Sequence, residues 1–388
     1  MIQGWEVKPL EAIAKIGAGG SAPQDKSSFT NGKFPFFRTS DVGKVKVGEV
    51  TVARDLLNLE GIKKLKPYRK GTILVPKSGA STFLNHRVIM GVDGFVSSHL
   101  ATIVPLPQLA EGRFLLYCLM GIQAQDLIQD HNYPSLKLSD LKSIPVPIPP
   151  LPEQKRIVAK LDQAFEVIDQ AKTNVERNLQ NAKELFQSKL NEIFSQQGDG
   201  WTEMTLGKLG KVSMCKRIMK HQTTQTGDIP FYKIGTFGKS PNAFISDEIY
   251  REFKEKYSFP QKGDILISAS GTIGRRVVYD GEPAYFQDSN IVWIDNNEEL
   301  ILNGYLYQFY GICDWNPSKG ATISRLYNDD LRRIPISFPN ISEQKKSVEI
   351  MEKLNAQTQH MMVQYQQQLD NLIELKKSIL QKAFNGEL

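Results

Sequence analysis

The chain has 388 residues, 40% of them hydrophobic and 23% charged, with a formal net charge of +6, so its composition is that of a globular protein with room for two domains and long helices. The three cysteines, Cys118, Cys215 and Cys313, are far apart and lack ligand spacing, which argues against a disulfide framework and a zinc site. The N-terminus lacks the apolar run of a signal peptide and no stretch is long enough to cross a bilayer, so we expect a cytoplasmic protein without a membrane partner.

Residues 1–150 are predicted to form a first domain of mixed α and β structure. Residues 35–38 are typical of a strand that ends in a basic residue, Arg38. Residues 70–79 combine a turn, a β-rich run of Ile, Leu and Val, and a small polar loop. A helix-like segment covers residues 114–128.

A long helix is predicted for residues 151–197. Prolines between residues 145 and 150 hold the chain extended, and Pro152 suits a first helical turn. Apolar residues then follow at heptad spacing. They are Leu161, Phe165, Ile168, Val175, Leu179 and Phe186.

Residues 198–340 repeat the pattern of the first domain. Gly200 and Trp201 correspond to Gly4 and Trp5, residues 230–233 to residues 35–38, and residues 262–271 to residues 70–79. A second helix-like segment covers residues 302–313.

A second long helix, residues 341–388, closes the repeat. Glu343 and Gln344 repeat Glu153 and Gln154 at an offset of 190 residues, and Ser342 is the expected N-cap. Its apolar stripe is diluted by Thr358 and several glutamines. The stripe consists of Met351, Leu354, Met361, Tyr365, Leu369 and Leu372.

The two stripes predict a fold in which the helices bury each other as an antiparallel coiled coil. The fold class is then α+β, with two mixed α/β domains separated by that coiled coil and related by a pseudo-twofold internal repeat. The alternative is that each stripe packs on its own domain. Each helix carries equal numbers of acidic and basic residues, so the positive excess lies on the two domains, which are the candidates for meeting a polyanion.

The loops of both domains are the candidate DNA-binding segments. Small residues with exposed backbone donors and guanidinium groups suit phosphate contact and the reading of guanine. The alternative is that these loops are solvated hairpins. The candidate residues are Lys77, Ser78, Ser81, Arg87, Lys216, Arg217, Ser270, Thr272, Arg275, Arg276, Lys319 and Arg325.

The sequence shows no motif of an enzyme. A P-loop, a convincing cofactor fingerprint and a nucleophile elbow are all missing, and the histidines are scattered. We therefore expect no catalytic residue, metal site or cofactor on this chain.

The whole chain resembles the specificity subunits of type I restriction-modification systems. The resemblance rests on two variable domains, each closed by a proline-rich segment and a helix that begins with Glu153-Gln154 or Glu343-Gln344. The second copy departs slightly, with residues 337–342 less rich in proline than residues 147–152.

The resemblance implies that each domain is a target-recognition domain that reads one half of a split site in double-stranded DNA. It also implies that the helices set the spacer between the half-sites and bind the modification subunits. The resemblance further implies that those subunits carry S-adenosylmethionine and that restriction or translocase subunits join the complexes that also cleave DNA.

Two other functions compete with this interpretation. A self-contained DNA methyltransferase with its own recognition domain would need a cofactor site on this chain. A coiled-coil adaptor would bind proteins through its two domains and would not need DNA.

Overall fold

The computed structural model describes residues 4–128, 132, 134–196, 198, 200–316, 318–319 and 324–388, without the side chains of residues 318 and 319. The chain divides into two compact units. Unit 1 comprises Met1–Val175 and Gln367–Leu388, and unit 2 comprises Glu176–Gln366. Each long helix is therefore shared between the two units.

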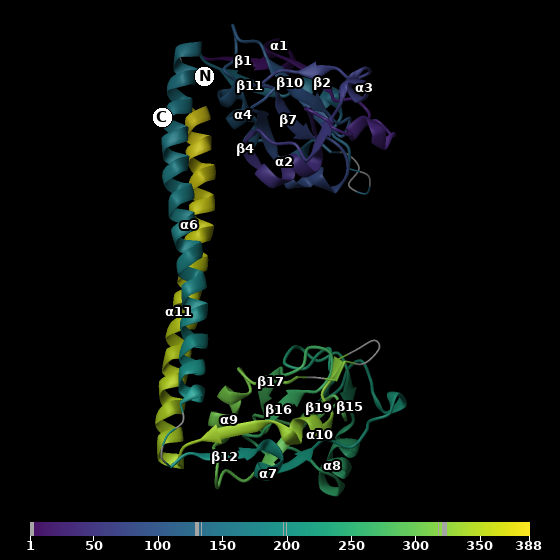
Figure 1. The fold of residues 1–388 in the computed structure, drawn as a ribbon, viewed down its shortest axis with the longest axis vertical. Coiled ribbons are helices and arrows are strands. Elements are labelled where there is room, and N and C mark those ends of the chain that lie inside the picture. The colour runs from purple at the N-terminus through teal and green to yellow at the C-terminus, as the bar shows by residue number, and fades with distance from the viewer. Residues whose placement is uncertain are drawn as a thin grey trace. The chain divides into compact units, whose positions relative to one another are not determined.

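Unit 1 contains two β-sheets and a terminal strand pair (Figure 1). The larger sheet has the order β2-β10-β7-β8-β4, the smaller has the order β5-β3-β9-β6, and β1 pairs with β11. The strands are β1 (Glu6–Pro9), β2 (Ala14–Ala18), β3 (Phe34–Phe37), β4 (Val47–Val50), β5 (Asp55–Leu57), β6 (Pro67–Tyr68), β7 (Ile73–Pro76), β8 (Arg87–Met90), β9 (Gly94–Val96), β10 (Leu100–Pro105) and β11 (Pro145–Ile148). The helices are α1 (Leu10–Ile13), α2 (Thr39–Val45), α3 (Leu59–Ile62), α4 (Gly112–Met120), α5 (Leu138–Lys142), η1 (Lys26–Phe29), η2 (Ala80–Leu84) and η3 (Ala124–Asp126).

Unit 2 repeats most of this topology, which confirms the predicted duplication. Its sheet β13-β19-β16-β17 corresponds to β2-β10-β7-β8, its sheet β15-β14-β18 corresponds to β5-β3-β9, and its pair β12-β22 corresponds to β1-β11. The strands are β12 (Thr202–Thr205), β13 (Gly210–Ser213), β14 (Ile229–Tyr232), β15 (Phe244–Ile245), β16 (Ile265–Ser268), β17 (Arg276–Val278), β18 (Tyr285–Phe286), β19 (Ile291–Asn296), β20 (Ser318–Lys319), β21 (Ser324–Arg325) and β22 (Pro335–Phe338). The helices are α7 (Leu206–Leu209), α8 (Asp247–Lys256), α9 (Asn303–Phe309), α10 (Asn328–Arg333) and η4 (Lys220–Gln222).

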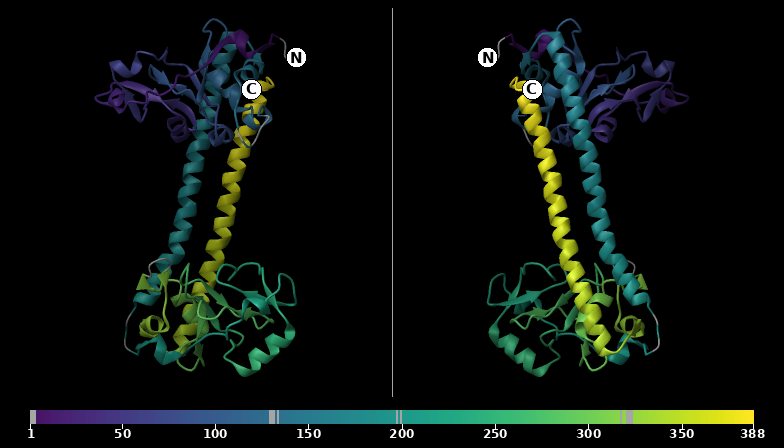
Figure 2. Two further views of the ribbon diagram at one scale, coloured as in Figure 1. Left: turned by 90° about the vertical axis from the view of Figure 1, so that its right-hand side faces the viewer. Right: turned by 90° about the vertical axis from the view of Figure 1, so that its left-hand side faces the viewer.

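The two long helices are α6 (Leu151–Ser195) and α11 (Ile341–Phe384), and they run side by side in opposite directions (Figure 2). In unit 1, Lys376 of α11 forms an ion pair of 2.9 Å with Asp169 of α6. In unit 2, Leu190 and Ile193 of α6 share a core cluster with Met351 of α11. The predicted antiparallel packing is therefore confirmed.

The heptad stripes also pack on their own domains, so the alternative holds for the ends of the helices. Leu161, Phe165 and Ile168 belong to the cluster that contains Phe114 of α4 and Leu380 of α11. Every apolar residue of the two predicted stripes is buried or half-buried. Thr358 is also buried, and its hydroxyl is satisfied by donating to the carbonyl of Leu354.

Helix boundaries differ from the sequence prediction: α6 ends at Ser195 and α11 at Phe384, short of residues 197 and 388. α11 begins at Ile341, and the side chain of Asn340, not Ser342, accepts the backbone N–H of Glu343 at 3.1 Å. α4 ends at Met120, well before residue 128, because Gly121 follows it. α9 likewise ends at Phe309, short of residue 313.

The repeated glutamine fastens each long helix to its domain. Gln154 is fully buried; its carbonyl accepts the N–H of Glu111 at 2.8 Å, and its amide donates to the carbonyls of Leu109 and Pro149. Gln344 makes the same three bonds, to Leu302, Leu300 and Pro339. A buried side chain that satisfies three backbone groups of its own domain explains why the Glu-Gln sequence recurs.

Candidate nucleic-acid interface

A pair of parallel strands ends at the same place in each unit and presents a cation there. In unit 1, β3 pairs with β9, and the N–H of Ser97 donates to the carbonyl of Phe37 at 2.9 Å, so Arg38 leaves the sheet beside Ser97. In unit 2, β14 pairs with β18, and the N–H of Gln287 donates to the carbonyl of Tyr232 at 2.9 Å, so Lys233 holds the matching position.

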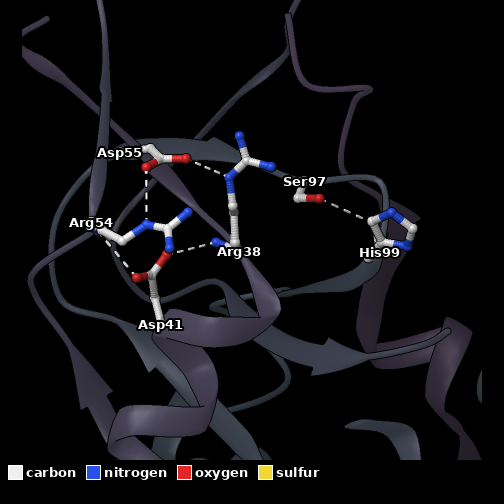
Figure 3. A network of polar contacts seen from close by, with 6 residues as sticks. All are labelled: Arg38, Asp41, Arg54, Asp55, Ser97 and His99. Carbon is white, nitrogen blue, oxygen red and sulfur yellow. Dashed lines mark hydrogen bonds and ion pairs between the residues drawn. The ribbon is translucent and has the colours of Figure 1, made fainter. Parts of the chain in front are cut away.

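Two carboxylates organise the arginines of unit 1 (Figure 3). Asp41 is buried and accepts the backbone N–H groups of Arg38 and Arg54 at 2.9 and 3.1 Å. Asp55 accepts the side-chain Nε–H groups of the same arginines at 2.5 and 3.2 Å. Both guanidinium groups are thereby oriented before any ligand binds.

The environment lowers the pKa of Asp55 and so favours its ionised form. Burial raises the pKa of Asp55, but hydrogen bonds from Arg38 and Arg54 and their charges outweigh burial and hold it below its ordinary value. The pKa of Asp55 is lower in the folded protein than in the unfolded chain. Ionised Asp55 therefore stabilises the folded state at pH values above its unfolded pKa, and this contribution is lost as the pH falls through its folded pKa. The guanidinium of Arg38 also lies 5.1 Å from the ring centre of Phe36, which restrains it further.

A second group of cations lies at the corresponding end of unit 2. Arg217 forms an ion pair of 2.8 Å with Asp288, and Lys216 lies 4.9 Å from the ring centre of Tyr257. Arg217 and Lys233 line a hollow of about 240 Å³. Because Arg217 is 65% exposed, its guanidinium can meet a polyanion without leaving Asp288.

Most of the predicted DNA-binding residues lie at the surface or are half-buried. Thr272, Lys216 and Arg217 are exposed, and Lys77, Ser78, Ser81, Arg275, Arg276 and Arg325 are half-buried. The side chain of Lys319 lies outside the described residues. Contact of any of them with DNA stays a prediction.

Arg87 and Ser270 are buried, which does not fit the expected exposed position. Arg87 is 4% exposed, and its guanidinium donates to the backbone carbonyls of Asn85 and Ile122. Burial lowers its pKa to about 10, so it stays protonated and supports the loop from inside. Ser270 is 9% exposed, and its hydroxyl donates to Asn290.

Arg275 and Arg276 have contacts within unit 2. Arg275 donates to the carbonyl of Phe237 at 2.8 Å, and the guanidinium of Arg276 lies 4.4 Å from the ring centre of Tyr307. The loop before them needs Gly274, which has a φ of +80° and where a Cβ would lie 2.2 Å from Nε1 of Trp315. Part of this basic loop is therefore committed to packing.

A hydroxyl also meets a polar side chain at the same point of each unit. The hydroxyl of Ser78, just after β7, lies 2.7 Å from Nδ1 of His99. The hydroxyl of Ser270, after β16, lies 2.7 Å from Oδ1 of Asn290.

Sequence reasoning missed several of these residues. Arg38 and Lys233 were visible as cations that end strands, but Arg54, Asp55, His99 and Asn290 carried no local signal. A comparison of the two copies around Ser78 and Ser270 would have pointed to His99 and Asn290.

The structure also bears on metal binding and on membrane insertion. In the described part of the chain, no group of three or more His, Cys, Asp or Glu residues could hold a metal ion. None of the helices described has both the length and the apolar character that crossing a membrane requires.

A model of the type I restriction modification DNA specificity domain matches residues 2–179 and again residues 198–371. The chain belongs to this family. It is a type I specificity subunit with two target-recognition domains. A putative type I restriction enzyme specificity subunit of Haemophilus influenzae is 38% identical over 364 residues, which cover 92% of this chain and 90% of that protein. The specificity subunit of the type I restriction enzyme MjaIX of Methanocaldococcus jannaschii is 30% identical over 43% of this chain and 39% of that protein.

Solved structures support the fold of the specificity subunit. A chain from a study of complex assembly and conformational transition in a type I restriction-modification system aligns with a TM-score of 0.81 at 20% identity, covering 100% of this chain and 99% of that one. The HsdS subunit of Thermoanaerobacter tengcongensis aligns with a TM-score of 0.60 at 20% identity, covering 100% and 98%.

Proposed function

We propose that each unit of this specificity subunit reads one half of a bipartite site in double-stranded DNA through the surface around the end of its parallel strands. The observation that carries the proposal is the repeated position of Arg38 and Lys233, each surrounded by side chains that differ between the copies. Cations of this kind contact phosphates and guanine edges, and different neighbours suit different half-sites.

The partners follow from the same role. We propose that α6 and α11 set the gap between the half-sites and bind modification subunits, which supply S-adenosylmethionine and methyl transfer in the cytoplasm. The specificity subunit itself contributes recognition and no catalytic group. In complexes that also cleave DNA, restriction and translocase subunits would join the assembly.

Methylome sequencing tests the proposal directly. A host that expresses this chain with its modification subunits is expected to methylate a split motif with a fixed gap, and deletion of this chain should abolish that motif. Unchanged methylation after deletion would contradict the proposal. Binding of S-adenosylmethionine by the purified chain alone would favour the methyltransferase alternative.

Replacing Asp55 by asparagine is expected to change the affinity for DNA and the preference for one half-site in opposite directions. Arg38 and Arg54 would lose their charged acceptor and their fixed orientation, while the surface gains one positive charge. We therefore expect tighter binding to non-specific DNA, a steeper salt dependence by up to about one unit of the log–log slope, and a weaker preference for one half-site. Fluorescence anisotropy at several salt concentrations measures all three quantities.

Asp93→Asn is the matched control because Asp93 forms an exposed ion pair with Arg69 in the same unit. It makes the same change in charge without touching Arg38. Equal loss of preference in both variants would show that charge, not orientation, is responsible.

A further inference from the structure

The pairs Ser78–His99 and Ser270–Asn290 lie in the same backbone framework. The N–H of Lys77 donates to the carbonyl of His99 at 3.0 Å, and the N–H of Ala269 donates to the carbonyl of Asn290 at 2.7 Å. On the other side, the carbonyls of Lys77 and Ala269 accept the N–H groups of Leu136 and Leu326 at 2.8 and 2.9 Å. The two serines, and with them His99 and Asn290, are therefore structurally equivalent.

His99 and Asn290, the variable side chains of this framework, lie on turns that differ between the two copies. In unit 1 the turn is closed by a hydrogen bond in which the N–H of Leu100 donates to the carbonyl of Ser97 at 2.9 Å. In unit 2 the N–H of Ile291 reaches the carbonyl of Gln287 at 3.1 Å, so this turn is one residue longer. Ser289 accommodates the extra residue with a φ of +53°, and its carbonyl accepts Arg325 at 3.2 Å. The framework is shared, and the tip has diverged.

Both variable side chains keep hydrogen-bonding capacity on the side away from the serine. Within the described part of the chain, Nε2 of His99 and Nδ2 of Asn290 make no hydrogen bond to protein, and His99 is exposed. The Ser270 hydroxyl uses one lone pair of the Asn290 carbonyl, which leaves a second acceptor position beside the amide donors. That donor and acceptor pair matches N7 and N6 of adenine in the major groove.

His99 presents a different pattern. The Ser78–His99 bond fits either tautomer of the ring; in the one where the Ser78 hydroxyl donates to Nδ1, the proton lies on Nε2 and the outer edge of the ring is a donor. The edge that offers adjacent acceptors in the major groove is N7 and O6 of guanine. Arg38, which leaves the sheet beside Ser97, adds a cation nearby (Figure 3).

We propose that His99 and Asn290 are equivalent specificity-determining residues, each oriented by its serine, which read a guanine in one half-site and an adenine in the other. This inference rests on the proposed DNA-reading function. It adds which side chain in each unit reads a base and which base class it accepts.

The test exchanges the two side chains in the full complex with the modification subunits. His99→Asn is compatible with the fold because unit 2 carries asparagine in the same framework. Methylome sequencing should show that one base pair of one half-site changes from guanine to adenine, with roughly tenfold to hundredfold discrimination, while the other half-site and the gap stay the same. Asn290→His should change one base pair of the other half-site in the opposite direction.

The serines provide a second measurement. Ser78→Ala should weaken the preference at the base pair that His99→Asn changes and leave the salt dependence of binding unaltered. Ser78→Thr, which keeps a hydroxyl, should restore the preference, and a merely structural role would not show this rescue at one base pair.

Two results would overturn the inference. One is an unchanged motif in both exchanged variants. The other is a uniform loss of affinity at every base pair with a shallower salt dependence, which would mark His99 as a phosphate contact. In either case the wild-type complex would still methylate its split motif, whereas a wild-type complex without one would instead contradict the proposed function.

Discussion

Replacing the buried Gln154 by leucine is expected to destabilise unit 1 by about 3 kcal/mol. The change removes the partners of the N–H of Glu111 and of the carbonyls of Leu109 and Pro149, one of them buried and two part-buried, and each buried group left without a partner costs roughly 1–3 kcal/mol. Urea unfolding followed by hydrogen exchange of unit 1 peptides measures the loss. The Gln344→Leu variant should weaken unit 2 in the same way.

Gln163→Leu is the matched control because Gln163 is exposed on the same helix. We expect its effect to stay within about 0.5 kcal/mol. If Gln154→Leu and Gln163→Leu unfold at the same urea concentration, Gln154 does not fasten α6 to its domain.

Inserting seven residues into both long helices, after Val175 and after Gln366, is expected to widen the gap in the methylated motif. These positions are the boundaries between the two units within α6 and α11. A heptad preserves the apolar stripe and adds about 10 Å of helix. At about 3.4 Å per base pair, the gap should grow by about three base pairs.

Methylome sequencing of the lengthened variant gives the new gap. Insertion into one helix alone is the control, because it shifts one stripe against the other and should reduce assembly. A lengthened variant that methylates the original motif would refute the idea that the helices set the gap.

The duplication and the long helices were predictable because their signals are local. A heptad stripe depends on residues three or four positions apart, and the two copies share an offset of 190 at the helix starts. The strands that directly precede Arg38 and Lys233 were predictable for the same reason. The repeated Glu-Gln sequence was also evident, but the hydrogen bonds that its glutamine makes to the domain were not.

The candidate site was less predictable because parallel strand pairing joins distant segments. β3 meets β9 some 60 residues later in the chain, and only this pairing places Arg38 beside Ser97. Asp55 approaches Arg38 through the pairing of β5 with β3. For Arg87 the sequence prediction was wrong in the other direction, because it expected an exposed side chain. A basic residue near a polar loop gives no sign that its guanidinium will be buried and will donate to backbone carbonyls.

The duplication of a mixed α/β domain followed by a long amphipathic helix follows from the amino-acid sequence alone. Apolar spacing and proline positions act over short distances, and the two copies can be compared residue by residue. Which polar side chains contact each other depends on the packing of distant elements. Gln154 forms hydrogen bonds with Leu109 and Glu111, and Ser78 with His99. The partners lie on segments that are distant in the sequence, so no local pattern predicts that they meet. Hydrogen bonds need partners within about 3 Å, and only the packed sheets bring these groups that close.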